Sequence, residues 1–216
     1  MGSETRMASG KHIAYHRVLE SLDQPGCPVC NLTAEDVRKR MEWMLYEHVN
    51  DPDTRGRITA SRGFCSEHGE LFIELGHPLG VSLIYLDVIS AVIKGVAPRA
   101  RVRRRTGRAA AECPACDWAK ASERQHLAVL VEYFDEEKLH GRLLQCRGFC
   151  VPHALKLLDL LPQPRQDIFG GVLMSQLAEL SCELSEIVRK SDYRCDEPWG
   201  SEGDAWIRAV RKLSGK

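Results

Sequence analysis

Eight cysteine and histidine residues have the spacing of metal ligands, in two sets of three thiols and one imidazole. In each set a CxxC motif is followed, after a gap long enough for one helix and a return loop, by a CxxH motif. The first set is Cys27, Cys30, Cys65 and His68, and the second set is Cys113, Cys116, Cys150 and His153. Three thiolates and one imidazole are a complete ligand set for a tetrahedral ion. We therefore expect each set to hold one metal centre.

Zinc and iron–sulfur clusters both use such soft ligands. Cys3His sets are common around structural Zn²⁺, whereas clusters usually take four cysteines. Two Zn²⁺ ions are therefore the first expectation, and an iron–sulfur cluster is the alternative. Four protein ligands leave no open position for a water nucleophile. His68 and Glu70 form the HxE motif of zinc deaminases, but Cys65 would fill the position that their chemistry needs. The sequence thus favours a non-enzymatic role, and we assign no catalytic residues.

Two other residues lie near these motifs. Cys146 precedes Cys150 by four residues, where the first half has Ser61. It could be an accessory thiol for cluster or redox chemistry, although a small buried apolar residue is the favoured interpretation. His77 could approach the first site, but its place just after a helix is more typical of a surface or capping histidine.

The motifs recur at a nearly constant offset. Cys113 follows Cys27 by 86 residues, and His153 follows His68 by 85 residues. An Arg-Gly-Phe tripeptide precedes the third cysteine in both halves. We interpret this pattern as an internal duplication.

Apolar residues follow helical spacing through most of the chain, and no stretch shows the alternation of a β-strand. We predict an all-α protein of two tandem three-helix units, each clipped by its own Cys3His site, with polar loops before each GFC motif. The third helix of the first unit, around residues 81–93, is apolar nearly all round, which is typical of a buried helix. The expected division is a flexible N-terminus (1–11), a first unit (12–96), an Arg-rich linker (97–112), a second unit (113–192) and a tail with a short amphipathic helix (193–216).

Charge and cysteine usage bound the partners and the compartment. Thirty basic and thirty acidic residues cancel, so no global field favours nucleic acid or an anionic membrane. Nine cysteines, mostly in paired spacing and without a signal peptide, indicate a reducing compartment, so we expect a cytoplasmic protein. Residues 81–93 are too few to span a bilayer. Six arginines in the linker make nucleic-acid binding a weaker alternative, because no aromatic residue is interleaved to stack a base.

The paired CPxC and RGFCxxH elements, with GVSLIYLD at residues 80–87 and DAWIRA at residues 204–209, resemble a family of bacterial proteins of unknown function. The resemblance runs from about His12 onward. It implies a bacterial, cytoplasmic, metal-binding helical protein and no particular activity. We expect an interaction or regulatory module with a protein partner, and the alternative is an iron–sulfur protein with a redox or sensing role.

Overall fold

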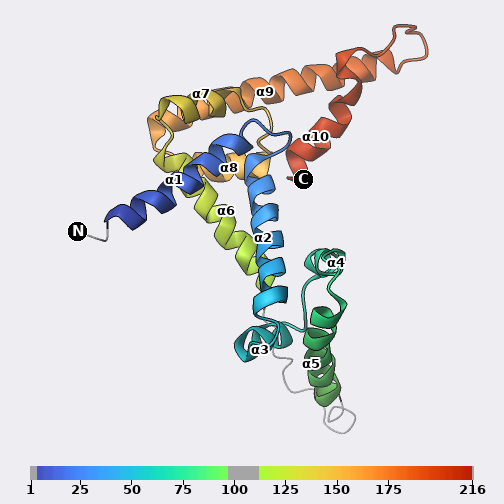
Figure 1. The fold of residues 1–216 in the computed structure, drawn as a ribbon. Helices are drawn as coiled ribbons and strands as arrows, with labels where there is room; N and C mark the ends of the chain where they lie inside the picture. The colour runs from blue at the N-terminus through green and yellow to red at the C-terminus, as the bar shows by residue number, and fades with distance from the viewer. Residues whose placement is uncertain (1–3, 97–111, 216) are drawn as a thin grey trace. The chain divides into compact units, whose positions relative to one another are not determined.

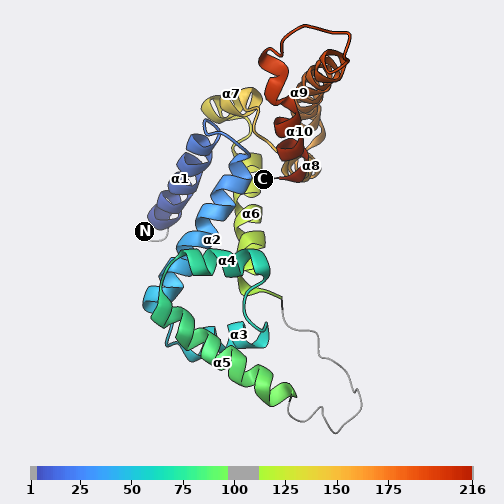
Figure 2. The same cartoon turned by 90° about the vertical axis from the view of Figure 1, so that its right-hand side faces the viewer.

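Helices form the regular structure of the protein (Figures 1 and 2). The structure is a computed structural model that describes residues 4–96 and 112–215. Across these two ranges there is no strand, so the all-α prediction is confirmed. The elements are α1 (Glu4–Ser21), α2 (Pro28–Glu47), α3 (Pro52–Ala60), α4 (Ser66–Glu74), α5 (Pro78–Val96), α6 (Pro114–Glu132), α7 (Glu137–Gln145), α8 (Val151–Leu160), α9 (Gln163–Lys190), the 3-10 helix η2 (Ser201–Asp204) and α10 (Ala205–Ser214).

The chain forms two compact units, but they are not the expected tandem halves. Unit 1 comprises Met1–Leu32 and Glu123–Lys216, and unit 2 comprises Thr33–Ser122. The boundaries therefore fall inside α2 and α6, in place of the predicted division into 12–96 and 113–192. The predicted linker at 97–112 lies almost entirely outside the described residues.

Unit 1 has a core of side chains from its two chain segments. Val18 of α1 is fully buried together with Leu130 of α6 and Leu157 of α8. Phe149, from the second RGF tripeptide, is also buried and meets the ring of Phe169 edge to face, with ring centroids 5.5 Å apart. Phe149 thus anchors the backbone next to Cys150 in the core.

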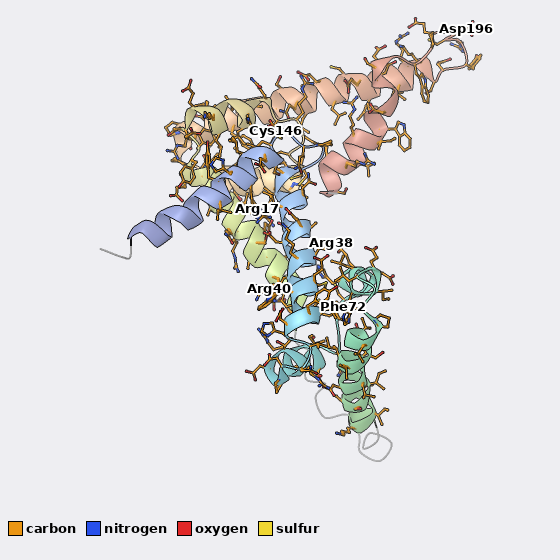
Figure 3. The ribbon with its side chains drawn as sticks, in the orientation of Figure 1. Arg17, Arg38, Arg40, Phe72, Cys146 and Asp196 are labelled. Carbon is orange, nitrogen blue, oxygen red and sulfur yellow. The ribbon has the colours of Figure 1, made fainter. Side chains whose placement is uncertain are left out.

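Unit 2 has its own core around α2, α3, α4 and α5. Met41, Ile58 and Ile84 are fully buried with Phe72, and Phe72 is labelled in Figure 3. Phe64, from the first RGF tripeptide, packs on Phe72 with ring centroids 5.0 Å apart. The same phenylalanine position therefore anchors the third cysteine in both units.

Two short helices, α3 and α7, occupy the segments that we predicted to be polar loops. The Asp51 side chain accepts a hydrogen bond from the Thr54 amide at 2.8 Å, and Pro52 opens the first turn of α3. Such a cap satisfies the free amides of a helix start, and proline fits its first position. Glu136 caps α7 through the Leu139 amide in the same way. The prediction of three-helix units was wrong because the Asn-Asp-Pro-Asp sequence that ends α2 also starts α3.

Helix α5 is not the buried helix that its composition predicted. Ile84 and Val88 are buried in the unit 2 core, and α3 packs against α5 (Figures 1 and 2). Most of the remaining surface of α5 is exposed, including Leu86 and Ile89. The helix is also longer than the predicted apolar stretch. Its segment Pro78–Gly95, of 18 residues, is long and apolar enough to cross a membrane by length and composition alone. Core helices of soluble proteins share this length and composition.

Helix α10 packs on α8 and α9 within unit 1. Ala205 is fully buried and Ile207 is half-buried, while Trp206, Val210 and Leu213 are exposed. The predicted amphipathic helix therefore exists, but Trp206, Val210 and Leu213 do not dock on the described part of the core.

Candidate metal centres

The eight predicted ligands form two Cys3His groups, but each group combines motifs from both halves of the sequence. We name the groups site 1 and site 2. Site 1 contains Cys27, Cys30, Cys150 and His153, and site 2 contains Cys65, His68, Cys113 and Cys116. The predicted pairing within each half was therefore wrong. Site 1 lies wholly in unit 1 and site 2 wholly in unit 2, so the exchange of partners matches the way in which the chain divides.

Each site joins the N-terminal ends of two helices. In site 1, Cys27 directly precedes α2 and Cys30 lies in its first turn, while Cys150 is the N-cap of α8. In site 2, α6 and α4 take these roles, with Cys65 as the N-cap of α4. Helix N-termini carry partial positive charge and lower the pKa of nearby thiols. Both sites are therefore suited to hold three thiolates.

The ligand atoms of site 1 have the spacing of a single tetrahedral ion. With Zn–S near 2.3 Å and Zn–N near 2.0 Å, two sulfurs of one tetrahedron are about 3.8 Å apart, and sulfur and nitrogen about 3.5 Å. The Sγ atoms of Cys30 and Cys150 are 3.8 Å apart. The Nδ1 atom of His153 lies 3.5, 3.2 and 3.1 Å from the Sγ atoms of Cys27, Cys30 and Cys150.

Site 2 repeats this geometry with its own residues. The Sγ atoms of Cys65 and Cys116 are 3.8 Å apart. The Nδ1 atom of His68 lies 3.1, 3.4 and 3.8 Å from the Sγ atoms of Cys65, Cys116 and Cys113. In both sites all four ligand atoms lie within 4.8 Å of one another. The donor set and its spacing therefore fit one zinc-sized ion in each site.

Proton binding competes with metal binding in site 1. Hydrogen bonds with Cys150 and Cys30 lower the pKa of Cys27. Burial alone would lower the pKa of His153, but its contacts with Cys150 and Cys27 outweigh burial and raise that pKa to about 10. A metal ion needs the deprotonated thiols and the neutral imidazole, so metal binding must release protons.

Glu123 orients the histidine of site 1. Its Oε1 atom lies 2.8 Å from the Nε2 atom of His153, and both side chains are largely buried. Lys156 also pairs with Glu123. Because Nε2–H donates to the carboxylate, Nδ1 is free to face the three sulfurs, which is a common arrangement around ligating histidines. His68 has no corresponding carboxylate contact among the described residues. The sequence analysis missed Glu123, because it lies on α6 and far from either site 1 motif in the chain.

Site 1 is also closed by its surroundings. Cys27 and Cys150 are buried, whereas every ligand of site 2 is partly exposed. At the end of α10 the carbonyl oxygen of Gly215 lies 3.0 Å from the Cys30 Sγ atom. Site 1 is therefore the less accessible of the two.

Gly148 of the second RGFC motif has no room for a side chain, because the backbone of Gly26 packs directly against it. A Cβ atom at residue 148 would lie 1.9 Å from the carbonyl oxygen of Gly26, the residue that precedes Cys27. Gly63 is the corresponding glycine of the first RGFC motif, which contains Cys65 of site 2. Its backbone is left-handed, with a φ of 93°, and the preceding residue, Arg62, also has a positive φ of 62°. The two RGF tripeptides therefore have different backbone conformations.

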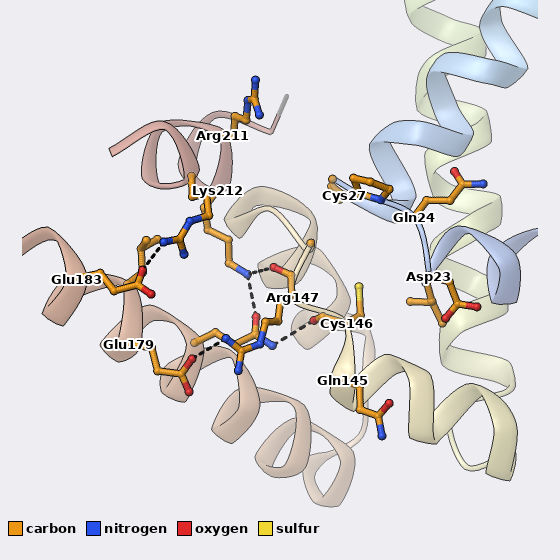
Figure 4. A pocket seen from close by; sticks show the side chains of 17 residues that line it. Asp23, Gln24, Cys27, Gln145, Cys146, Arg147, Glu179, Glu183, Arg211 and Lys212 are labelled. Carbon is orange, nitrogen blue, oxygen red and sulfur yellow. Dashed lines mark hydrogen bonds and ion pairs between the residues drawn. The ribbon is translucent and has the colours of Figure 1, made fainter. Parts of the chain in front are cut away.

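Cys146 and His77 lie outside both ligand groups. Cys146 is buried at the end of α7 and lines a cavity of about 670 Å³ in unit 1. Figure 4 shows this cavity with Cys27 and Cys146 on its wall. Lys212 donates a hydrogen bond to the carbonyl oxygen of Arg147 there. Burial raises the pKa of Cys146. His77 accepts a hydrogen bond from the Gly80 amide at 3.1 Å, so it caps α5 as expected for a capping histidine.

The fold and the two sites define a helical protein with two Cys3His groups that could each hold a metal ion. The chain belongs to a family that is described only as a family of unknown function, DUF6062, whose model matches residues 13–216. No curated protein and no solved structure matches the chain significantly.

Proposed function

We propose that the protein is a non-enzymatic interaction or regulatory module whose two units are each stabilised by a structural zinc ion. The observation that carries this proposal is the spacing of the ligand atoms, which lie within 4.8 Å of one another in each site. This is the spacing of four ligands around one ion. Three thiolates and one Zn²⁺ leave each site with one net negative charge, which the helix N-termini at both sites offset.

The same spacing argues against the iron–sulfur alternative. A cluster distributes its protein ligands over two or more irons, so ligands of different irons lie further apart than ligands that share one ion. Both sites bring the Nδ1 atom within 3.1 Å of a sulfur. A cluster would have to push the helix ends apart in both units. Cys146, the residue that could have supported cluster chemistry, is not part of either group.

Complete coordination favours a structural role over a catalytic one. Each group supplies four protein ligands, and a zinc site of this kind leaves no position for a substrate or a water nucleophile. Surfaces of the two metal-stabilised units would then carry the function by binding another macromolecule. We further propose that the protein is bacterial and cytoplasmic, as the resemblance implies, and that its two halves arose by duplication.

Metal analysis tests this proposal. We expect protein purified without oxygen to be colourless and to contain about two zinc ions per chain, because each Cys3His group fits one ion. Elemental analysis and an assay for acid-labile sulfide give the answer on one sample. A brown protein with iron and acid-labile sulfide would establish the cluster alternative instead.

A further inference from the structure

Unit 1 contains a cavity beside site 1 that has the size of a small-molecule site. Its volume is about 670 Å³, which lies in the range of pockets that enclose organic ligands. Its walls come from the turn between α1 and α2, the end of α7, and helices α9 and α10 (Figure 4). Leu22, Pro25 and Leu180 supply apolar wall, together with the thiol of Cys146. The cavity therefore has room and apolar surface for the body of a small molecule.

The charges on the cavity wall do not cancel. Each carboxylate on the wall already has a guanidinium partner: Asp23 pairs with Arg142, Glu179 with Arg147, and Glu183 with Arg208. Two further cations, Arg211 and Lys212, line the cavity without a carboxylate partner among the described residues. Ion pairing therefore leaves two positive charges uncompensated, and such an excess attracts an anion.

Lys212 is the cation best placed to bind that anion. Its side chain is half-buried and runs from α10 toward Arg147 (Figure 4). The ammonium group donates to the carbonyl oxygen of Arg147 at 3.0 Å and to the Oε1 atom of Gln176 at 2.9 Å, and both acceptors are neutral. An ammonium group has three donors, so one remains for a ligand. Burial lowers the pKa of Lys212, which is the cost of a charge that lacks an anionic partner.

The negative charge of site 1 is the alternative partner for Lys212. Cys27 lines the same cavity, and a Zn²⁺ ion with three thiolates carries one net negative charge. The hydrogen bonds of Lys212 go to Arg147 and Gln176, however, and not to a ligand sulfur. The N-termini of α2 and α8 already face the thiolates and offset their charge. Lys212 is therefore better placed for a ligand in the cavity than for the metal centre.

We propose that this cavity binds a small organic anion, whose carboxylate or phosphate group accepts a hydrogen bond from Lys212 while its apolar body lies against Leu22 and Leu180. A hydrogen bond between an ammonium group and an oxyanion is about twice as strong as one between neutral groups. Gln176 holds the ammonium group in place for it. A metal cation fits the cavity less well, because the excess charge is positive. The inference goes beyond macromolecular binding, and it does not depend on which metal occupies site 1.

Calorimetric titration of the full-length, metal-loaded protein with octanoate, octyl phosphate and octan-1-ol tests the proposal. We expect both anions to bind. Octan-1-ol has the same chain without the charge and should bind at least about tenfold more weakly, because it cannot form the charge-assisted hydrogen bond. The two anions show which oxyanion the cavity prefers. A bound anion should also slow the alkylation of Cys146 by iodoacetamide and leave that of the exposed Cys182 unchanged.

Three variants test the role of Lys212. K212M keeps the aliphatic stem and removes the charge, so it should bind octanoate at least about tenfold more weakly. The matched control K138M removes an exposed lysine of α7 that does not line the cavity, and it should bind like the natural protein. Q176E keeps Lys212 and gives it a carboxylate partner inside the protein, so it should also weaken the binding of octanoate.

Four results would overturn the proposal. The first is no binding of either anion, and the second is equal binding of octanoate and octan-1-ol. The third is binding that leaves the alkylation of Cys146 unchanged, which would place the anion outside the cavity. The fourth is equal binding of octanoate by K212M and the natural protein; a lower metal content in K212M would then assign Lys212 to the charge of site 1. Circular dichroism and metal content of each variant distinguish these results from a failure of the metal sites. The comparison of the three ligands uses the natural protein, so it decides the matter even where a variant is misfolded.

Discussion

Replacing Cys27 with serine is expected to remove the metal ion from site 1 and to unfold much of unit 1, while site 2 keeps its ion. Binding of structural zinc is worth roughly 10–16 kcal/mol in small peptides, and a whole domain is stable by only roughly 5–15 kcal/mol. Losing one ligand therefore removes a large share of the stability of the unit. Hydrogen exchange of the full-length protein should show lost protection in α8 and in the part of α6 that belongs to unit 1, with α4 and α5 retained.

Cys146→Ser is the matched control for Cys27→Ser. Cys146 is also a buried cysteine of unit 1, but it is not one of the ligands. We expect this variant to keep two metal ions and to lose only the modest stability that a buried thiol contributes. An unchanged melting temperature and an unchanged metal content in Cys27→Ser would contradict the structural role of site 1.

Gly148→Ala is expected to destabilise unit 1 by about 3 kcal/mol, at the upper end of the usual cost of overpacking. The reason is that the new Cβ atom would lie 1.9 Å from the carbonyl oxygen of Gly26, and neither backbone can move without displacing Cys27 or Cys150. The affinity of site 1 for its metal should fall together with the stability. Urea unfolding and competition with a chelator measure the two effects.

Gly141→Ala provides the comparison for this variant. Gly141 lies inside α7, and a Cβ atom there would meet nothing within 4 Å. Alanine is the better helix former by about 1 kcal/mol, so this variant should be as stable as the natural protein or more stable. If Gly148→Ala behaved like Gly141→Ala, the close approach of the two loops would be wrong.

The ligands could be predicted from the sequence because their chemistry is local. A CxxC or CxxH motif at the start of a helix places two donors on one turn, whatever the remainder of the chain does. All eight residues that this reasoning selected lie in the two groups. Glu123 could not be found in this way, since a carboxylate that orients a ligand carries no spacing signal.

The pairing of the motifs could not be predicted because it depends on tertiary structure. Spacing shows only that each motif begins a helix, and any CxxC can complete a ligand set with any CxxH. The nearest partner in sequence was the natural expectation for a duplicated chain. The structure instead pairs Cys27 with Cys150, 123 positions later in the numbering. Close contact between Gly26 and Gly148 accompanies this pairing, but such a contact is not visible in the composition of either loop.

The burial of apolar residues was the other feature that sequence patterns could not predict. A helix that is apolar nearly all round is usually buried, yet α5 buries Ile84 and Val88 and exposes Leu86 and Ile89. Periodicity shows how many apolar faces a helix has, and it does not show how many partners the fold supplies. Unit 2 covers one face of α5, and the face with Leu86 and Ile89 is exposed in the described part of the chain.

Metal content of two double variants tests the exchanged pairing most directly. C27S/C150S removes two ligands of site 1 and none of site 2, so the full-length protein should retain about one metal ion per chain. C27S/C65S removes one ligand from each site and should retain none. Alkylation of the remaining cysteines, followed by mass spectrometry, should find Cys113 and Cys116 protected only in C27S/C150S. The reverse result, one ion in C27S/C65S and none in C27S/C150S, would show that each half of the sequence builds its own site and would contradict the account.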